Sequence, residues 1–347
     1  MGKVSLKTWI SIVTFTLVAV ILYLSRHELV RAWELLGRVN IWILLLLLPL
    51  QALSYYAAGA MVFSYLKQKF GIDEPAHVQA RIALELNFVN HILPSAGLSG
   101  ASYMTWRLGQ LGVSTARATL AQVVRFAATF SAFLVLLVIS VIAVTLDSGL
   151  ERQLILVSSG LASAIIFGTI TTIYIIQSPT RMHKVASRIT PFINGLWRKL
   201  LRRKQPLLKQ AVVTKYFDDL HDDYQELAKN PRILKQPFVW GLVFVATEIA
   251  LFWVTFWALG TPVNPAPLLI AYGIAGFAGA FFITPGGVGG YEALMVGFLA
   301  TTGLDHGAVI AAVLLARTIL IILTILSGYY FYQRAINTYG NDTTQRS

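Results

Sequence analysis

Long apolar runs separated by short polar segments dominate this chain. A membrane-spanning helix needs about 20 predominantly apolar residues. The runs that approach or exceed this length are 9–24, 41–65, 126–146, 154–176, 238–259 and 309–332. We therefore predict an all-α polytopic membrane protein with about six transmembrane helices, in which residues 1–347 form a single transmembrane domain.

Two further apolar segments are interrupted by proline and small residues. The interrupted segments are 78–93 with 98–111, broken at Pro94, and 267–283 with 291–302, broken at Pro285. Each piece is too short to span comfortably. Irregular backbone at membrane depth is tolerated only where protein buries it or where it lines a watery cavity. We predict that each pair forms a re-entrant helical hairpin and that each break is a candidate site.

The sequences that follow the two breaks match each other in order. Eighteen residues after each proline lies a glycine, Gly112 or Gly303. An aliphatic residue follows each glycine, and then a residue of the helix N-cap type, Ser114 or Asp305. Each cap opens a long apolar helix, so the same series of elements follows both breaks.

This shared order predicts an internal repeat. Three predicted spans separate the two hairpins, an odd number, so the repeats 76–146 and 267–332 have opposite orientations in the membrane. Inverted repeats with paired broken helices near the midplane are typical of transporters, and the interruptions point to the transport site. The long helix of each repeat carries one arginine, Arg125 or Arg317.

Composition and charge support the membrane class. Only 13% of the residues are charged and 56% are hydrophobic, whereas soluble domains carry about 25% charged residues. The absence of cysteine excludes disulfides, zinc–thiolate sites and thiol catalysis. On a membrane protein, the net charge of +12 indicates topology and lipid contact, and no nucleic-acid partner is expected.

The basic residues predict the topology. The segment 178–237 holds 13 of the 28 lysines and arginines and is predicted to be a cytoplasmic loop. Counting spans from it places the N- and C-termini in the cytoplasm, and we expect a bacterial inner-membrane location. The segment 25–40, predicted to be external, is an exception because it holds three arginines. The basic loop either contacts anionic lipid headgroups or is a solvated loop whose charge only follows topology.

Charged residues within the predicted membrane segments are few and are therefore candidate functional residues. We select Arg81, Glu85, Arg125, Glu248, Glu292 and Arg317 as the candidates. Arg125 and Arg317 are candidate phosphate ligands, because a guanidinium binds phosphate in bidentate fashion. Alternatively, each arginine satisfies free carbonyl groups of a broken hairpin. Arg81 lies one helical turn from Glu85, so these two residues are expected to pair locally.

The two remaining carboxylates have several possible roles. Glu248 and Glu292 are candidate partners for the two arginines, or contacts for a cationic group of the substrate. Glu292 follows the glycine run closely, so an alternative is that it stabilises the start of a helix through the helix dipole.

Residues at the two breaks complete the predicted substrate-binding set. They are Asn90, Pro285, Gly286, Gly287 and Gly289. Asn90 and its neighbour His91 either line a cavity or satisfy backbone groups of the hairpin. The glycine run lacks the spacing of a nucleotide-binding loop, and no metal-binding or nucleophile–base motif is present. We therefore predict no cofactor, no metal and no enzymatic activity.

The stretch ITPGGVGGYEA at 283–293 resembles the signature of the lysylphosphatidylglycerol synthase transmembrane-domain family, whose members are also described as flippase-like. Asn87, Leu93-Pro94, Gly97 and Gly100, followed by GVS at 112–114, are similar to the first-half motif of that family. The sequence departs from the family at Ser95-Ala96, where a more glycine-rich turn is typical.

In the bifunctional members, this membrane region is fused to a soluble aminoacyl-transfer domain and is credited with moving the modified phospholipid across the bilayer. Only about fifteen polar residues follow residue 332 here, so the resemblance implies lipid translocation or an accessory role and not aminoacyl transfer.

We therefore expect a lipid flippase-like transporter for a phospholipid or a polyprenyl-phosphate-linked lipid. One alternative is a non-catalytic accessory subunit, or a membrane-embedded enzyme, for lipid-linked aminoacyl or glycosyl transfer, acting with a partner transferase. Another is a secondary transporter for ions or small solutes.

Overall fold

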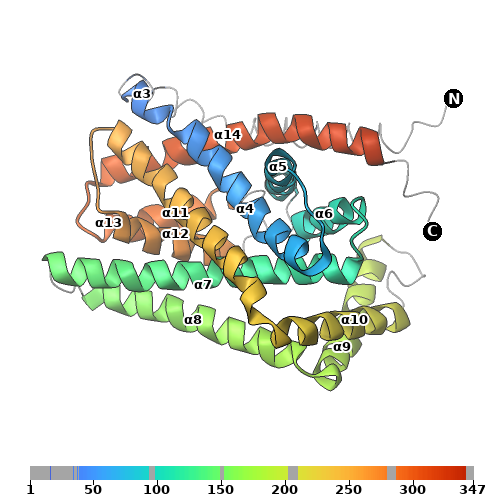
Figure 1. Ribbon diagram of the computed structural model, residues 1–347. Helices are drawn as coiled ribbons and strands as arrows, with labels where there is room; N and C mark the ends of the chain where they lie inside the picture. The colour runs from blue at the N-terminus through green and yellow to red at the C-terminus, as the bar shows by residue number, and fades with distance from the viewer. Residues whose placement is uncertain are drawn as a thin grey trace.

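The computed structural model describes residues 39–93, 98–148, 152–201, 210–279 and 287–340, together with Thr16, Glu34 and Gly37. All regular secondary structure in these ranges is helical (Figure 1). Apart from Thr16, the predicted span 9–24 lies outside the described residues.

Five helical segments are long and apolar enough to cross a membrane. They are Ile41–Phe70, Thr115–Ile142, Val157–Ile176, Pro231–Ala258 and His306–Tyr339. The helices that form them are α3 (Ile41–Leu44), α4 (Leu47–Phe70), α7 (Thr115–Ser148), α8 (Arg152–Ile176), η1 (Pro231–Leu234), α11 (Lys235–Ala258) and α14 (His306–Tyr339). They coincide with five of the six predicted spans, which confirms the all-α membrane class.

Four shorter helices occupy the predicted hairpins. They are α5 (Ala76–Ile92), α6 (Leu98–Gly109), α12 (Pro265–Gly279) and α13 (Gly290–Ala300). The longest, α5, has 17 residues, which gives a length of about 26 Å. α5 packs against α6, and α12 packs against α13. The breaks at 94–97 and 280–286 lie outside the described residues, so the re-entrant course remains a prediction.

The helices of the two halves of the chain pack against each other. α5 packs against α14, and α12 packs against α7, so each broken pair contacts the long helix that follows the other pair (Figure 1). α7 and α14 both have 34 residues. Before them, Gly112 and Gly303 have φ of 80° and 77°, a backbone conformation that favours glycine.

The predicted N-caps are also present. The Asp305 carboxylate accepts a hydrogen bond from the Ala308 N–H at 2.8 Å, and the Ser114 hydroxyl accepts one from the Arg117 N–H at 3.4 Å. These features are compatible with an inverted repeat, whose boundaries remain a prediction.

Small residues allow the long helices to cross closely. A Cβ atom added to Gly328 of α14 would lie 2.5 Å from the Cβ atom of Phe88 on α5. A Cβ atom added to Gly241 of α11 would lie 2.7 Å from the Ala128 carbonyl oxygen on α7. Close backbone approach of this kind is a common way to pack helices in membranes, where lipid provides no hydrophobic drive for helix association.

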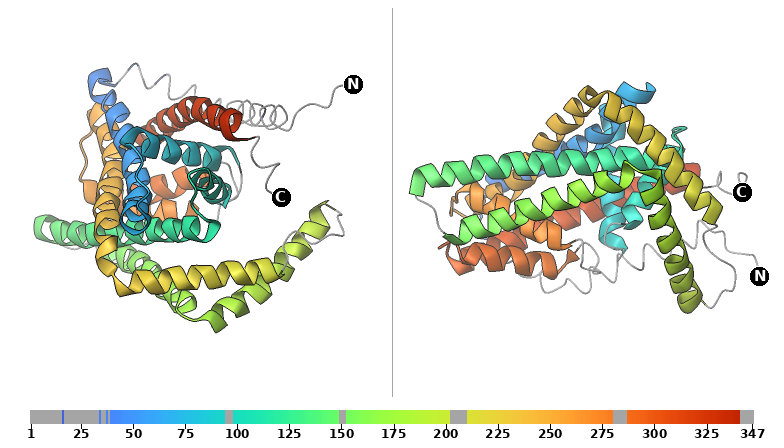
Figure 2. Two further views of the ribbon diagram at one scale, coloured as in Figure 1. Left: turned by 45° about the vertical axis from the view of Figure 1, so that its right-hand side comes forward. Right: turned by 90° about the horizontal axis from the view of Figure 1, so that it is seen from below.

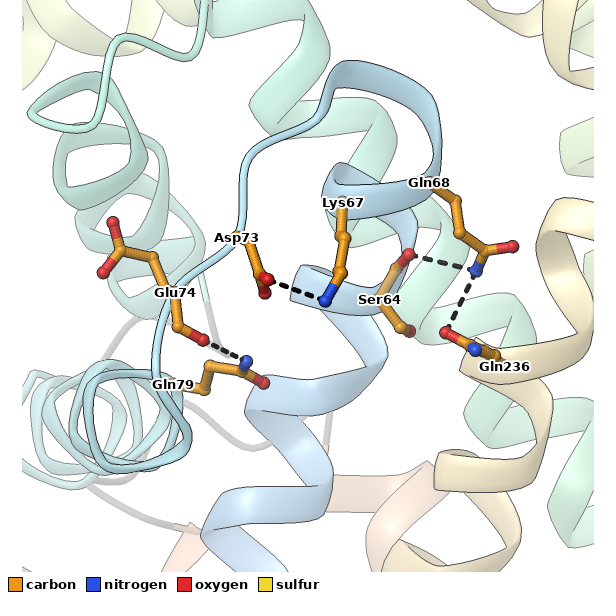
Figure 3. Close-up of polar contacts among 7 residues, drawn as sticks. All are labelled: Ser64, Lys67, Gln68, Asp73, Glu74, Gln79 and Gln236. Carbon is orange, nitrogen blue, oxygen red and sulfur yellow. Dashed lines mark hydrogen bonds and ion pairs between the residues drawn. The ribbon is translucent and has the colours of Figure 1, made fainter.

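Polar contacts close the turn between α4 and α5 (Figure 3). Lys67 and Asp73 form an ion pair at 2.6 Å, and the Gln79 side chain donates to the Glu74 carbonyl oxygen at 2.6 Å. Gln68 joins this end of α4 to the start of α11 by donating to the Gln236 side-chain oxygen at 3.3 Å. This end of the bundle is the predicted cytoplasmic end.

The described residues of the predicted basic loop 178–237 are largely helical. They form α9 (Pro179–Leu201), α10 (Gln210–Lys229) and η1, and both long helices turn away from the direction of α7 and α8 (Figure 2). Met182 and Ala186, four residues apart on α9, are buried, so this helix has an apolar face. α9 packs against α10, and α10 also packs against α7.

Candidate functional site

The start of α13 holds a buried ion pair. Glu292 is the third residue of α13, and its Oε2 accepts a hydrogen bond from the Gly289 N–H at 2.7 Å. Its Oε1 accepts a hydrogen bond from Arg317 Nε at 2.7 Å. Only 12% of the Glu292 side chain and 14% of the Arg317 side chain are exposed. Glu292 therefore stabilises the helix start and also neutralises the arginine.

An aromatic ring holds the other side of this arginine. The Arg317 guanidinium lies over the Tyr291 ring at 4.2 Å, and the Tyr291 ring stacks on that of Phe252 from α11, with centroids 6.5 Å apart. Cation–π attraction is strongest where the pair is removed from water. The guanidinium is thus fixed between a carboxylate and an aromatic face.

Two more titratable groups complete what we call the central charge cluster: Glu248, Glu292, Arg317 and His91. Glu248 lies within electrostatic range of Arg317, and its Oε1 accepts a hydrogen bond from the Ser54 hydroxyl at 2.5 Å. His91 lies within electrostatic range of both Arg317 and Glu292. Its Nδ1–H donates to the Asn87 carbonyl oxygen at 2.8 Å. The end of α5 therefore reaches the ion pair formed by α13 and α14.

Arg125 lies apart from this cluster, on α7. Its Nε is buried and has no hydrogen-bond partner among the described residues, and its guanidinium lies over the Phe126 ring at 4.9 Å. Within the part of the chain that the structure describes, Arg125 has no ion pair, and no carboxylate contributes to its electrostatic environment. Burying a cation without a counter-charge is costly, so this guanidinium is a candidate for ligand contact.

The face of α7 that carries Arg125 packs against α6. One turn earlier on α7, the Gln122 side chain donates to the Ala101 carbonyl oxygen at 3.3 Å and to the Thr105 hydroxyl at 3.0 Å. Residues three apart share a helix face.

An apolar groove lies next to Arg125. It has a volume of about 460 Å³ and runs between α7, α8, α10 and η1. Its walls include Phe126, Phe130, Ile165, Ile173, Tyr224 and Leu227. Because the ring of Phe126 contacts the Arg125 guanidinium, the unpaired cation lies at the edge of this groove.

The other predicted site residues have mainly structural contacts. The Asn90 side-chain oxygen accepts a hydrogen bond from the Gly100 N–H at 2.9 Å, so Asn90 provides a partner for a backbone N–H group in the first turn of α6. Gly287 and Gly289 have φ of 70° and 90° at the start of α13, a conformation that glycine adopts at little cost. Pro285 and Gly286 lie outside the described residues.

The structure thus brings together three of the four charged residues that the sequence predicts for the site, Glu248, Glu292 and Arg317, and leaves Arg125 apart. The sequence reasoning missed Tyr291, although it adjoins Glu292. It also missed Ser54, one of several hydroxyl-bearing residues in the apolar run 41–65.

A second buried ion pair involves a residue that the sequence reasoning missed. The expected i, i+4 pair of Arg81 with Glu85 is present at 3.5 Å, but Arg107 Nε lies closer to the Glu85 carboxylate, at 3.0 Å. Arg107 also falls within the apolar segment 98–111, and this position could have drawn attention to it. In the described ranges, no three imidazole or carboxylate groups converge as metal ligands would.

Comparison with known proteins gives two findings. Residues 8–328 match the family described as the lysylphosphatidylglycerol synthase TM region. A protein of Methanothermobacter thermautotrophicus described as a UPF0104 membrane protein is 23% identical over 233 residues, which cover 67% of each chain.

Proposed function

The chain belongs to the lysylphosphatidylglycerol synthase TM-region family, and on that premise we propose that it is a flippase-like transporter. Its substrate is an anionic or zwitterionic lipid that carries a phosphate, either a phospholipid or a polyprenyl-phosphate-linked lipid. The multi-pass helical architecture is suited to this activity, because the lipid tails can stay in the bilayer while the headgroup crosses within the protein.

The unpaired Arg125 is the observation that carries the proposal. A charged group at membrane depth costs about 2.5–3.5 kcal/mol on insertion scales, so such a group normally has a partner. Arg125 has none among the described residues. A lipid phosphate supplies the missing anion and accepts two parallel hydrogen bonds from a guanidinium. In this proposal Arg125 is the first headgroup contact.

The apolar groove supports the same assignment. Its volume of about 460 Å³ falls within the range of about 300–1,000 Å³ that is common for ligand pockets. A phosphate bound at Arg125 places the attached acyl or prenyl chain beside Phe126, at the groove edge. The combination of a cation and an adjacent apolar groove suits a lipid better than a small hydrated solute.

The central charge cluster has a different role in this proposal. The Glu292 carboxylate already neutralises Arg317, so a phosphate reaches this arginine only by replacing the carboxylate. Arg125 is the eleventh residue of α7 and Arg317 the twelfth of α14, which places each about 17 Å from its helix start. If the two halves are inverted repeats, the helices start on opposite sides. The lipid phosphate would then pass from one arginine to the other near the midplane.

The proposed topology has both termini and the basic helices α9 and α10 on the cytoplasmic side of a bacterial inner membrane. The 13 basic residues of 178–237 support it through the positive-inside rule. In this arrangement, the amphipathic α9 lies against anionic lipid headgroups.

A flipping assay in proteoliposomes tests the proposal. We expect Arg125→Gln to reduce the flipping rate of a fluorescent phospholipid at least tenfold, the factor that corresponds to about 1.4 kcal/mol in the barrier. The control is Arg232→Gln, which removes the same charge from an exposed position on η1 and should leave the rate unchanged. An Arg125→Gln protein that flips at the wild-type rate would refute the assignment.

Stability measurements separate a transport role from a structural one. The Arg125 guanidinium makes no hydrogen bond with the described residues, so Arg125→Gln should leave the unfolding temperature unchanged or raise it. If Arg125 instead holds the fold together, flipping and unfolding temperature should fall together.

A further inference from the structure

A second group of arginines surrounds a small polar cavity at the C-terminal end of α14. The cavity has a volume of about 120 Å³, and its polar lining residues are Arg81, Glu85, Arg107, Arg334, Thr338 and Tyr339. Arg334 lies 17 residues beyond Arg317 on α14, a rise of about 26 Å. The cavity is therefore well separated from the central charge cluster, and by the predicted topology it lies at the cytoplasmic end.

Positive charge exceeds negative charge in this cavity. Among the described residues that line it, three arginines face one carboxylate, which leaves an excess of two positive charges. Glu85 Oε2 already accepts hydrogen bonds from Arg107 Nε at 3.0 Å and from the Tyr103 hydroxyl at 2.9 Å. Glu85 Oε1 lies 3.5 Å from Arg81 Nε. The carboxylate thus holds two arginines in place and leaves the charge excess uncompensated.

Some of the polar atoms in this cavity have no partner. The Arg107 side chain is only 1% exposed, yet its Nη1 has no hydrogen bond with any residue that the structure describes. Arg81 Nε and Glu85 Oε1 are also buried without one. A buried donor left without an acceptor is destabilising, and more so when it is charged. The ring of Tyr339, 4.8 Å from the Arg107 guanidinium carbon, limits the orientations that this guanidinium can adopt.

The rim of the cavity adds further donors. Arg334 is exposed and forms no ion pair within the described ranges. Thr338 and Tyr339 add hydroxyl groups. One water needs about 10–15 Å³ of such volume, so a cavity of about 120 Å³ has space for a polyatomic anion.

We propose that this cavity is a phosphate-binding site, separate from the transport path. It suits a tetrahedral phosphate group, carried either by an anionic lipid headgroup or by a free phosphate ion, because arginine guanidinium groups bind that shape in bidentate fashion. Bound phosphate bridges α5 and α6 to the end of α14 and supplies the acceptor that Arg107 Nη1 lacks. The site stabilises the protein on its predicted cytoplasmic side, whether or not the protein transports lipid.

Binding is tested on the full-length protein in detergent by thermal unfolding. One arm adds inorganic phosphate at constant ionic strength, with chloride as the reference. The other adds dioleoylphosphatidic acid in mixed micelles, with dioleoylphosphatidylcholine as the reference. We expect at least one phosphate arm to raise the unfolding temperature in a saturable manner. The arm that does so identifies the source of the phosphate.

Variants locate the binding. Arg334→Gln should weaken the apparent affinity about tenfold, the effect of removing one charge-assisted hydrogen bond. The exposed Arg334 forms no ion pair with the described residues, so this variant should fold. Arg107→Lys keeps the charge but removes the bidentate geometry, and should also weaken binding. The exposed control Arg232→Gln should bind as the wild type does.

Three results would overturn the proposal. One is the absence of stabilisation in both phosphate arms. Another is equal stabilisation of the wild type and Arg334→Gln. The third is stabilisation that Arg125→Gln abolishes and Arg334→Gln retains, which would assign the binding to the proposed transport site. Conversely, stabilisation that survives Arg125→Gln would uphold this site even if the flipping assay fails.

Discussion

The ion pair of Glu292 and Arg317 can be tested with a double-mutant cycle. Glu292→Gln keeps the side-chain shape but removes the charge. The variant has one carbonyl oxygen in place of two carboxylate oxygens. In the wild type, the two oxygens accept from the Gly289 N–H at 2.7 Å and from Arg317 Nε at 2.7 Å, and a single oxygen is a poorer acceptor for these two donors. Arg317→Gln leaves the carboxylate with the Gly289 N–H and without its cation.

The expected magnitude follows from the burial of the pair. Breaking a buried ion pair by removing one partner costs about 3–5 kcal/mol. The side chains here are 12% and 14% exposed, and glutamine retains one hydrogen bond, so we expect about 2–4 kcal/mol for each single variant. The double variant removes both charges together and should cost less than the sum of the singles. We expect a coupling energy of about 2 kcal/mol, within the range for residues in contact.

The assay is equilibrium unfolding of the wild type, the two single variants and the double variant in mixed micelles, followed by tryptophan fluorescence. The matched control is the exposed pair of Lys67 and Asp73, whose side chains are 58% and 57% exposed. Its cycle, with Lys67→Gln and Asp73→Asn, should give a coupling of only about 0.2–1 kcal/mol that falls further at high salt.

Additive losses in the Glu292 and Arg317 cycle would refute the reasoning, because additivity means that the two charges do not interact in the folded state. A coupling as sensitive to salt as that of the control pair would also refute it, since it would place Glu292 and Arg317 in contact with solvent.

Two further predictions concern helix contacts. Gly328→Ala places a methyl group against the phenylalanine of α5 that packs there, and should cost about 1–3 kcal/mol of unfolding free energy. Gly276→Ala, with no atom within 4 Å of the added Cβ, is the control, and equal stability of the two variants would contradict this close packing. Asn90→Ala removes the acceptor of the Gly100 N–H and should speed amide hydrogen exchange in the first turn of α6. Asn230→Ala, at an exposed position whose side chain caps no helix, should leave that exchange unchanged, and protection in Asn90→Ala equal to the wild type would contradict the cap.

The sequence predicts the helices of this protein better than it predicts which side chains contact one another. An apolar run of about 20 residues has few alternatives to a membrane helix, so five spans could be predicted from length alone. The contact of Arg317 with Glu292 could not be predicted from the sequence, because the two residues lie 25 positions apart on different helices. For Glu85, the i, i+4 spacing on a helix predicts Arg81 as the partner. The fold brings Arg107, 22 positions away, closer to the carboxylate.

The segment 178–237 shows a different limit of sequence reasoning. Its many charges favoured a loop, because charge dominates any average taken along the chain. The helix depends instead on a few apolar positions spaced four apart, such as Met182 and Ala186, which are buried. A hydrophobic average hides that periodicity, so the charge count leads to a prediction for the side of the membrane but to none for the helix boundaries within the segment.

The contrast between the surroundings of Arg317 and Arg125 is the strongest physical argument for function. Arg317 has a carboxylate at 2.7 Å and an aromatic ring at 4.2 Å, so its charge is compensated within the protein. Arg125 has a ring at 4.9 Å and no carboxylate among the described residues. A residue kept only for stability would gain from a partner or from replacement by an apolar side chain, since an unpaired buried charge is destabilising. A site that must accept an anion and later release it needs its charge uncompensated, at a cost in stability. Loss of flipping in Arg125→Gln together with an unchanged or higher unfolding temperature is therefore the pattern that distinguishes a ligand site from a structural arginine.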